Sequence, residues 1–305
     1  MNFWTPWSQR GKAVAFVAAC AVAISTTANG VLVDITSPTT TWTPVLYSNN
    51  NPDPSSDQQT GSAEGDIVGN ATHASVYTTF GNADTPSLTD GTLAFRIRIG
   101  ADSSPAGFKA ALFVGIDGNS DGTLDLFLGV NNSGSANMIG IWDPGTGLNI
   151  SPSTTSIVST PLVSYTQTAA NYWWTPVTAT NDPTTAGAFD LDASGPDQFL
   201  SFSIPFADVV AQLATNGITG FNENSTMSYV ISTATQANSL NQDLNGVGKS
   251  YDTSASWSTL GVLSNPITPA GVAVVPELDS AVGVVGLLVA VFAHQHFKRR
   301  RARVQ

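Results

Sequence analysis

Short runs of alternating apolar and polar residues, separated by turn residues, fill much of the chain between residues 31 and 275. In residues 93–99 every odd position is apolar, and Arg96 and Arg98 stand between them. A period of two is typical of a half-buried β-strand, so we expect both arginines to face solvent. Further strand candidates are residues 200–204, 112–116, 124–130, 138–142, 227–233 and 257–263.

One segment has the periodicity of a helix instead. Its apolar side chains are Phe206, Val209, Val210 and Leu213, which follow helical spacing. Pro205 suits the first turn, and Asn216 followed by Gly217 forms a stop signal. We therefore expect a single short helix among the strands.

Many short strands with one helix predict a mostly β protein, a β-sandwich of jelly-roll-like topology. The chain has no repeat period, which disfavours a propeller or solenoid. We expect the sandwich to span residues 31–264, and residues 265–275 to form a spacer before the C-terminal segment.

The first thirty residues have the three parts of an export signal. Arg10 and Lys12 precede an apolar run at residues 13–24, and small polar residues then lead to Gly30. The run is too short to span a bilayer, so we expect a signal helix that signal peptidase removes after Gly30. The alternative is a lipobox that ends at Cys20, the only cysteine of the chain.

Cleavage after Gly30 leaves a body without cysteine, which excludes disulfides and thiolate chemistry. Residues 31–275 hold four basic and twenty acidic residues, a net charge of −16. Such a charge repels phosphate backbones, so nucleic acid is not an expected partner. About 245 residues are enough for one ordinary packed core.

The chain ends with an apolar segment and a basic cluster. Residues 280–297 would form a helix about 27 Å long, close to the roughly 30 Å of a bilayer core. The basic residues after it are Lys298, Arg299, Arg300, Arg301 and Arg303. The positive-inside rule keeps these residues cytoplasmic, so a transmembrane helix here places the body on the far side of the membrane.

This tail resembles the PEP-CTERM group of sorting signals in its Pro-Glu motif, its single span and its arginine-rich end. The sequence of residues 275–279 is Val-Pro-Glu-Leu-Asp, close to the Val-Pro-Glu-Ile-Asp variant of that group. The resemblance covers residues 276–305 and implies processing by an exosortase-like membrane protease. The alternative is a permanent tail anchor that is not cleaved. It also implies that the protein is located in the cell envelope or on the outer surface of a Gram-negative bacterium. The C-terminal helix would first anchor the protein in the inner membrane. The sorting-signal residues are Pro276, Glu277, Asp279, Arg299, Arg300 and Arg301.

The sharpest motif of the body lies at residues 117–125. Aspartate or asparagine stands at positions 1, 3, 5 and 9, with Gly122 at position 6, the spacing of an oxygen-lined calcium loop. Position 12 is Leu128, which excludes an EF-hand, and the loop resembles the calcium hairpins of FG-GAP repeats. The alternative is an Asx-rich turn without an ion. The predicted Ca²⁺ ligands are Asp117, Asn119, Asp121, Thr123 and Asp125.

Four other features are weaker. Trp173 and Trp174 form a candidate glycan platform, although adjacent strand residues face opposite sides. The aspartates of residues 190–197 read as a turn, and His73 reads as a surface or hydrogen-bonded residue. Residues 49–65 form a polar loop, and residues 235–246 form a second polar stretch, read as a loop or hairpin.

The body has no Gly-x-Ser-x-Gly elbow, His-Glu-x-x-His motif or phosphate-binding glycine loop. These features favour a structural or adhesive surface protein that is not an enzyme. The alternative is a carbohydrate-binding β-sandwich, with surface polysaccharide as partner, and a glycan-acting enzyme is a minor alternative because paired carboxylates abound.

Overall fold

The computed structural model describes residues 33–47, 53–60, 62–82, 85–103, 106–184 and 187–271. The predicted signal peptide and the sorting tail, including its transmembrane helix, lie outside these residues. The helices that are described are too short or too polar to cross a bilayer.

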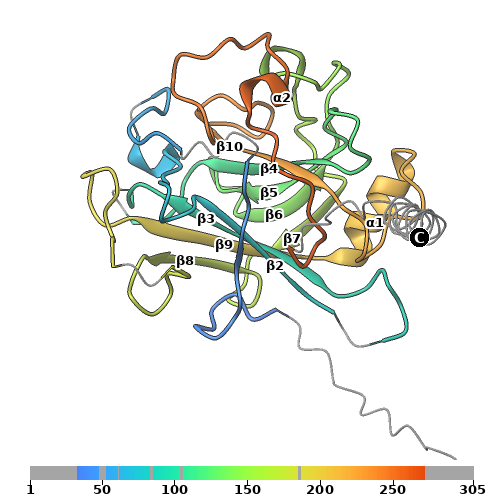
Figure 1. Ribbon diagram of the computed structural model, residues 1–305, viewed down its shortest axis with the longest axis horizontal. Helices are drawn as coiled ribbons and strands as arrows, with labels where there is room; N and C mark the ends of the chain where they lie inside the picture. Colours follow the sequence, from blue (N-terminus) through green and yellow to red (C-terminus); the bar gives the residue numbers. More distant parts are fainter. Residues whose placement is uncertain are drawn as a thin grey trace, which may run out of the picture.

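Two antiparallel sheets dominate the described chain, which confirms the prediction of a mostly β protein (Figure 1). The first sheet has the order β1-β2-β3-β9-β8, with strands Thr43–Pro44, Val76–Gly81, Thr92–Ile99, Gln198–Pro205 and Tyr172–Pro176. The second has the order β11-β10-β4-β5-β6-β7, with strands Asp243–Leu244, Ser228–Ala234, Ala111–Asp117, Leu126–Asn131, Met138–Trp142 and Val163–Thr166. Six of the seven predicted strands lie at or within two residues of these bounds.

The main core lies between the two sheets, as in a β-sandwich. Alternate residues of β3, β9, β4, β5, β6 and β10 contribute its buried side chains. Phe95 of β3 meets Tyr229 of β10 edge to face, with ring centroids 5.3 Å apart, so the two sheets are in direct contact. The period of two in the sequence therefore reflects this shared inner face.

The predicted helix is confirmed. Helix α1, Phe206–Thr215, follows Pro205 directly and buries Phe206, Val209 and Leu213 against the main core. Gly217 has a φ of 91°, in the left-handed region that glycine adopts at little cost, which fits the predicted stop signal. In Figure 1 the helix lies at one end of the two sheets.

The expectation that Arg96 and Arg98 face solvent is wrong. Both project from the outer face of β3, yet their exposed fractions are 1% and 0%. Arg96 donates to the carbonyls of Ile35 and Asn181, both at 2.9 Å, because loops from two distant parts of the chain cover this face. The alternation of apolar and polar residues predicts which side chains share a face of the strand. It does not predict which distant segments pack on that face.

The predicted strand at residues 257–263 is also wrong, because its first half forms helix α2, Trp257–Leu260. The Ser256 side chain accepts a hydrogen bond from the Thr259 amide at 3.2 Å, and Gly261 ends the helix with a φ of 75°. These caps satisfy the backbone better than a strand without a partner would. Trp257 is buried in a second apolar cluster on the outer face of the six-stranded sheet. Helix α2 lies above β10 and β4 in Figure 1.

The segment predicted as a spacer begins against the sandwich. Ile267 is buried in the main core and forms an isolated bridge with Met227. The Asn265 amide also donates to the Leu46 carbonyl at 2.8 Å. This contact, with the bridge between Tyr47 and Ser264, joins the N-terminal segment to the C-terminal end of the described chain.

Candidate functional site

The predicted calcium loop connects β4 to β5. Asp117 is the last residue of β4 and is buried, whereas Asn119 and Asp121 lie on the turn. Ser120 and Gly122 have positive φ values of 62° and 84°, which fold the short loop back on itself. The loop therefore is a hairpin with its polar side chains gathered at one end of the six-stranded sheet.

Backbone amides occupy part of the acceptor capacity of this hairpin. The two Asp117 carboxylate oxygens accept from the amides of Asp121 at 3.2 Å and Gly122 at 2.9 Å. Asp125 accepts from the Gly118 amide at 2.8 Å. These are the contacts of an Asx-rich turn, yet an ionised carboxylate has about four lone-pair sites, so the contacts leave sites for an ion.

The rest of the predicted set is close by but is more exposed. Asp121 accepts from the Thr123 amide at 2.8 Å and from the Asn119 side chain at 3.0 Å. These bonds outweigh partial desolvation and lower the pKa of Asp121. Burial, and then the charges of Asp117 and Asp121, raise the pKa of Asp125 to about 6. The hairpin thus holds one solvated and two partly desolvated carboxylates.

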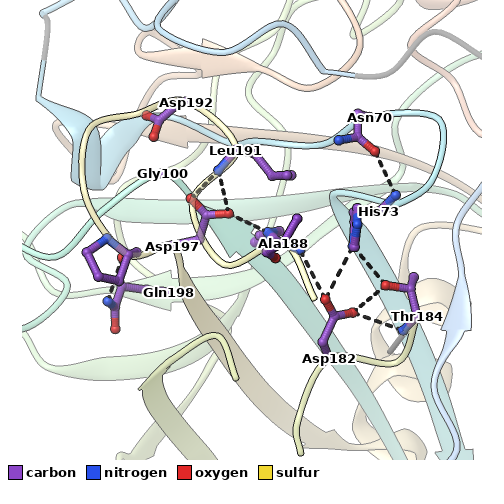
Figure 2. Close-up of polar contacts among 12 residues, drawn as sticks. Asn70, His73, Gly100, Asp182, Thr184, Ala188, Leu191, Asp192, Asp197 and Gln198 are labelled. Carbon is purple, nitrogen blue, oxygen red and sulfur yellow. Dashed lines mark hydrogen bonds and ion pairs between the residues drawn. The ribbon is translucent and has the colours of Figure 1, made fainter. Parts of the chain in front are cut away.

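Within the described residues, two groups of three carboxylates have one oxygen each within 4.8 Å of the others, and neither lies in this hairpin. The first is Asp190, Asp192 and Asp197. Two of its members have partners. Asp192 accepts from the Ser194 amide and hydroxyl. Asp197 accepts from the Leu191 amide (Figure 2). This agrees with the interpretation of residues 190–197 as a turn.

Asp197 also belongs to a buried network around Arg98. The guanidinium of Arg98 lies 2.6 Å from Asp197 and 3.5 Å from Asp182. Figure 2 shows Asp182 in contact with His73 and Thr184 as well. The His73 ring nitrogen is 2.8 Å from the Thr184 hydroxyl and 3.3 Å from Asp182. His73 is therefore a buried, hydrogen-bonded residue and not a surface one.

The candidate glycan platform is divided between two faces, as adjacent strand residues require. Trp174 packs against the main core, with its ring centroid 5.6 Å from that of Phe108. Its indole nitrogen donates to the Asp102 carboxylate at 3.1 Å. Trp173 lies on the outer face, with its ring centroid 5.3 Å from the Arg96 guanidinium carbon. Both side chains are half-buried, and the structure does not bring them together as one surface.

The sequence did not predict the second group of carboxylates. It consists of Asp53, Asp57 and Asp243, all buried, and it lies where the polar loop at residues 49–65 meets the polar stretch at residues 235–246. The unusual polarity of both stretches was the only signal. Nothing in either stretch indicated the other as its partner, because the two lie far apart in the sequence.

The predicted sorting-signal residues lie outside the described residues. Comparison of the chain with protein-family models, with curated proteins and with solved structures found no match.

Proposed function

We propose that the chain is an exported surface protein whose β-sandwich has a structural or adhesive role and no catalytic activity. The export signal and the sorting-like tail support export and tethering at the membrane, or release by an exosortase-like enzyme. The chain moves between the two sheets after β3, after β7 and after α1, which supports a jelly-roll-like sandwich.

The position of His73 is the observation that carries the non-catalytic role. It is the single histidine of residues 31–275, and acid–base chemistry near neutral pH most often uses histidine. Its exposed fraction is 4%, and its Nδ1 atom is engaged with Asp182 and Thr184. A side chain held in this way stabilises the fold and is poorly placed to meet a substrate.

The hairpin at residues 117–125 supports a structural Ca²⁺ in this domain. Its carboxylates belong to one tight turn, and the charges of Asp117 and Asp121 add to the cost of ionising Asp125. Burial raises the pKa of Asp117, so a bound cation would stabilise the charged form of that carboxylate.

Cell fractionation with intact-mass measurement tests the surface role. We expect a mature protein that begins after Gly30, lies in the envelope, and lacks the residues after the Pro276 region. The double variant Pro276→Ala plus Glu277→Ala should retain the tail and stay in the inner membrane, while Thr268→Ser serves as the control. A cytoplasmic protein of full mass would contradict the proposal.

A cavity of about 470 Å³ favours carbohydrate binding as the second candidate function. Its lining includes Trp42, Tyr77 and Thr184, and the Trp42 indole nitrogen is buried without a hydrogen-bond acceptor. The volume lies within the roughly 300–1,000 Å³ of small-ligand sites. Aromatic lining of this kind suits contact with the apolar face of a sugar ring.

A glycan array with the full chain tests this second candidate. Ala71 is exposed and lines the cavity, so Ala71→Trp should abolish any selective glycan signal by filling it. Trp173→Ala tests the platform, and Leu148→Trp, on a residue outside the cavity lining, is the matched control. The absence of any glycan signal from the wild-type chain would reject this candidate.

A further inference from the structure

Two polar segments from opposite ends of the body form one buried cluster. The Gln59 amide donates to the Gln242 carbonyl at 2.8 Å, which docks the turn at residues 53–60 on the strand β11 segment. The Gly246 amide then donates to the Asp53 carboxylate, although the two residues are 193 positions apart in sequence. Strand β11 is an edge strand of its sheet, so this turn covers an edge that would otherwise be open.

The carboxylates of this cluster are buried, and two of them have oxygens without a hydrogen-bond partner. The exposed fractions of Asp53 and Asp57 are 2% and 8%. One oxygen of Asp53 and both oxygens of Asp57 are buried without any hydrogen-bond donor in the protein. The third member, Asp243, accepts from the Ile67 amide at 2.6 Å. An unpartnered buried carboxylate is costly, so the cluster needs a donor or a positive charge that the fold does not supply.

The charged neighbours do not supply enough positive charge, because the charge of Lys249 acts to lower the pKa of Asp57 and that pKa is still raised. Among the described residues, no lysine, arginine or histidine nitrogen lies within 4.0 Å of these three carboxylates. The nearby amine of Lys249 is directed to the carbonyls of Gln58 and Gln59, at 3.3 and 3.4 Å. The other neighbouring carboxylate, Asp66, adds negative charge.

Burial and mutual repulsion act on all members of the cluster. Burial, followed by the charge of Asp243, raises the pKa of Asp53 well above its usual range. Burial and then the charge of Asp66 raise the pKa of Asp57 to about 6. Full ionisation of the cluster therefore costs free energy, which a bound cation would reduce.

The geometry fits a hard cation. One oxygen from each carboxylate lies within 4.8 Å of the other two. Two oxygens bound to one Ca²⁺ at about 2.3–2.6 Å can lie up to about 5 Å apart. All candidate ligands are carboxylate oxygens, which Ca²⁺ prefers, and Ca²⁺ accepts irregular coordination geometry.

We propose that Asp53, Asp57 and Asp243 bind a Ca²⁺ ion that fastens the turn at residues 53–60 to the edge strand β11. The ion offsets two of the three negative charges of the cluster and gives Asp57 the partner that it lacks. This site is independent of the hairpin at residues 117–125 and of the proposed surface role.

Calcium titration of the full chain tests the proposal. The protein is held in a mild detergent, stripped with EDTA and titrated with CaCl₂ up to about 1 mM, within the usual range of extracellular sites. Calorimetry counts the bound ions, and tryptophan fluorescence follows thermal unfolding. We expect Asp57→Asn to bind one Ca²⁺ fewer than the wild-type chain and to lose that part of the calcium-induced rise in melting temperature.

The direction of the change in melting temperature in EDTA distinguishes loss of a cation ligand from general destabilisation of the fold. Asparagine keeps the shape of Asp57 but removes its buried charge, so Asp57→Asn should melt at a higher temperature than the wild-type chain in EDTA. Asp252→Asn, which changes an exposed aspartate, is the matched control and should leave both measurements unchanged. If Asp57→Asn binds as many Ca²⁺ ions as the wild-type chain and shows the same calcium-induced rise in melting temperature, the proposal is overturned. This holds even if its melting temperature in EDTA is higher.

Two further variants keep the test decisive if Asp57→Asn does not fold. Asp243→Asn removes a ligand from the other segment and should lose the same ion. Asp117→Ala plus Asp121→Ala removes the hairpin site alone, so one remaining Ca²⁺ in this variant supports the buried site. No remaining Ca²⁺ there overturns it, while loss of the hairpin ion bears only on the proposed function.

Discussion

The sandwich contains two buried groups of charged residues that are neutralised in different ways. Around Arg98, the carboxylates of Asp182 and Asp197 lie within 3.5 Å of the guanidinium, and the protein supplies both signs of charge. Around Asp57, three buried carboxylates come together and no basic nitrogen of the described residues lies within 4.0 Å. The first group is complete within the chain, and the second requires a partner from solution.

This difference has consequences for how each group responds to change. Removal of Arg98 leaves two buried anions, whereas removal of one acid from the cluster at Asp53, Asp57 and Asp243 relieves repulsion. The first group should be sensitive to mutation and indifferent to the medium, and the second should be sensitive to the calcium concentration.

The largest expected effect is that of Arg98→Met. It leaves Asp182 and Asp197 buried without their cation and should lower the free energy of unfolding by about 3–5 kcal/mol. Denaturant titration of the full chain measures this loss. Asp197→Asn in the Arg98→Met background should recover part of it, and Lys109→Met, on an exposed side chain, should cost less than about 0.5 kcal/mol. A similar loss for Lys109→Met would show that the comparison between the groups is mistaken.

Calcium removal should have the next largest effect. A site present only in the folded state stabilises by RT ln(1 + [Ca²⁺]/Kd), about 1.4 kcal/mol at ten times Kd. For a domain of this size that corresponds to a fall of about 3–6 °C in melting temperature when EDTA is added. Magnesium at equal concentration is the control for ionic strength. A melting curve that is the same with and without EDTA would show that the cluster at Asp53, Asp57 and Asp243 does not require an external cation.

The sequence predicts only part of the fold and of these charged groups, and particular residues show why. The hairpin at residues 117–125 could be predicted because its ligands are neighbours in the chain, and α1 because its apolar spacing and stop signal are local. By contrast, the carboxylate of Asp243 reaches Asp57 from β11. The carbonyls that cover Arg96 belong to Ile35 and Asn181. Such contacts depend on tertiary packing, for which no local pattern exists.

The hairpin should contribute less to stability than the buried cluster. Asp117→Ala plus Asp121→Ala removes two of its carboxylates and should reduce the calcium-induced rise in melting temperature by about 1–3 °C, because weak extracellular sites are only partly filled near 1 mM. The remaining rise should persist in this variant. Differential scanning calorimetry at several calcium concentrations distinguishes the two contributions, which should add because the sites share no side chain. Loss of the entire response would assign all the calcium dependence to the hairpin.

The smallest expected effect is that of Asp190→Asn, in the remaining group of three carboxylates. Asp190 is exposed, and its neighbours Asp192 and Asp197 already accept hydrogen bonds from Ser194, Leu191 and Arg98. Water screens its charge, so the free energy of unfolding should change by less than about 0.5 kcal/mol, equally with calcium or EDTA. A calcium response that Asp190→Asn abolishes would place the cation beside the Arg98 network instead. That result would reverse the comparison, since the group around Arg98 would then be the one that depends on a cation from solution.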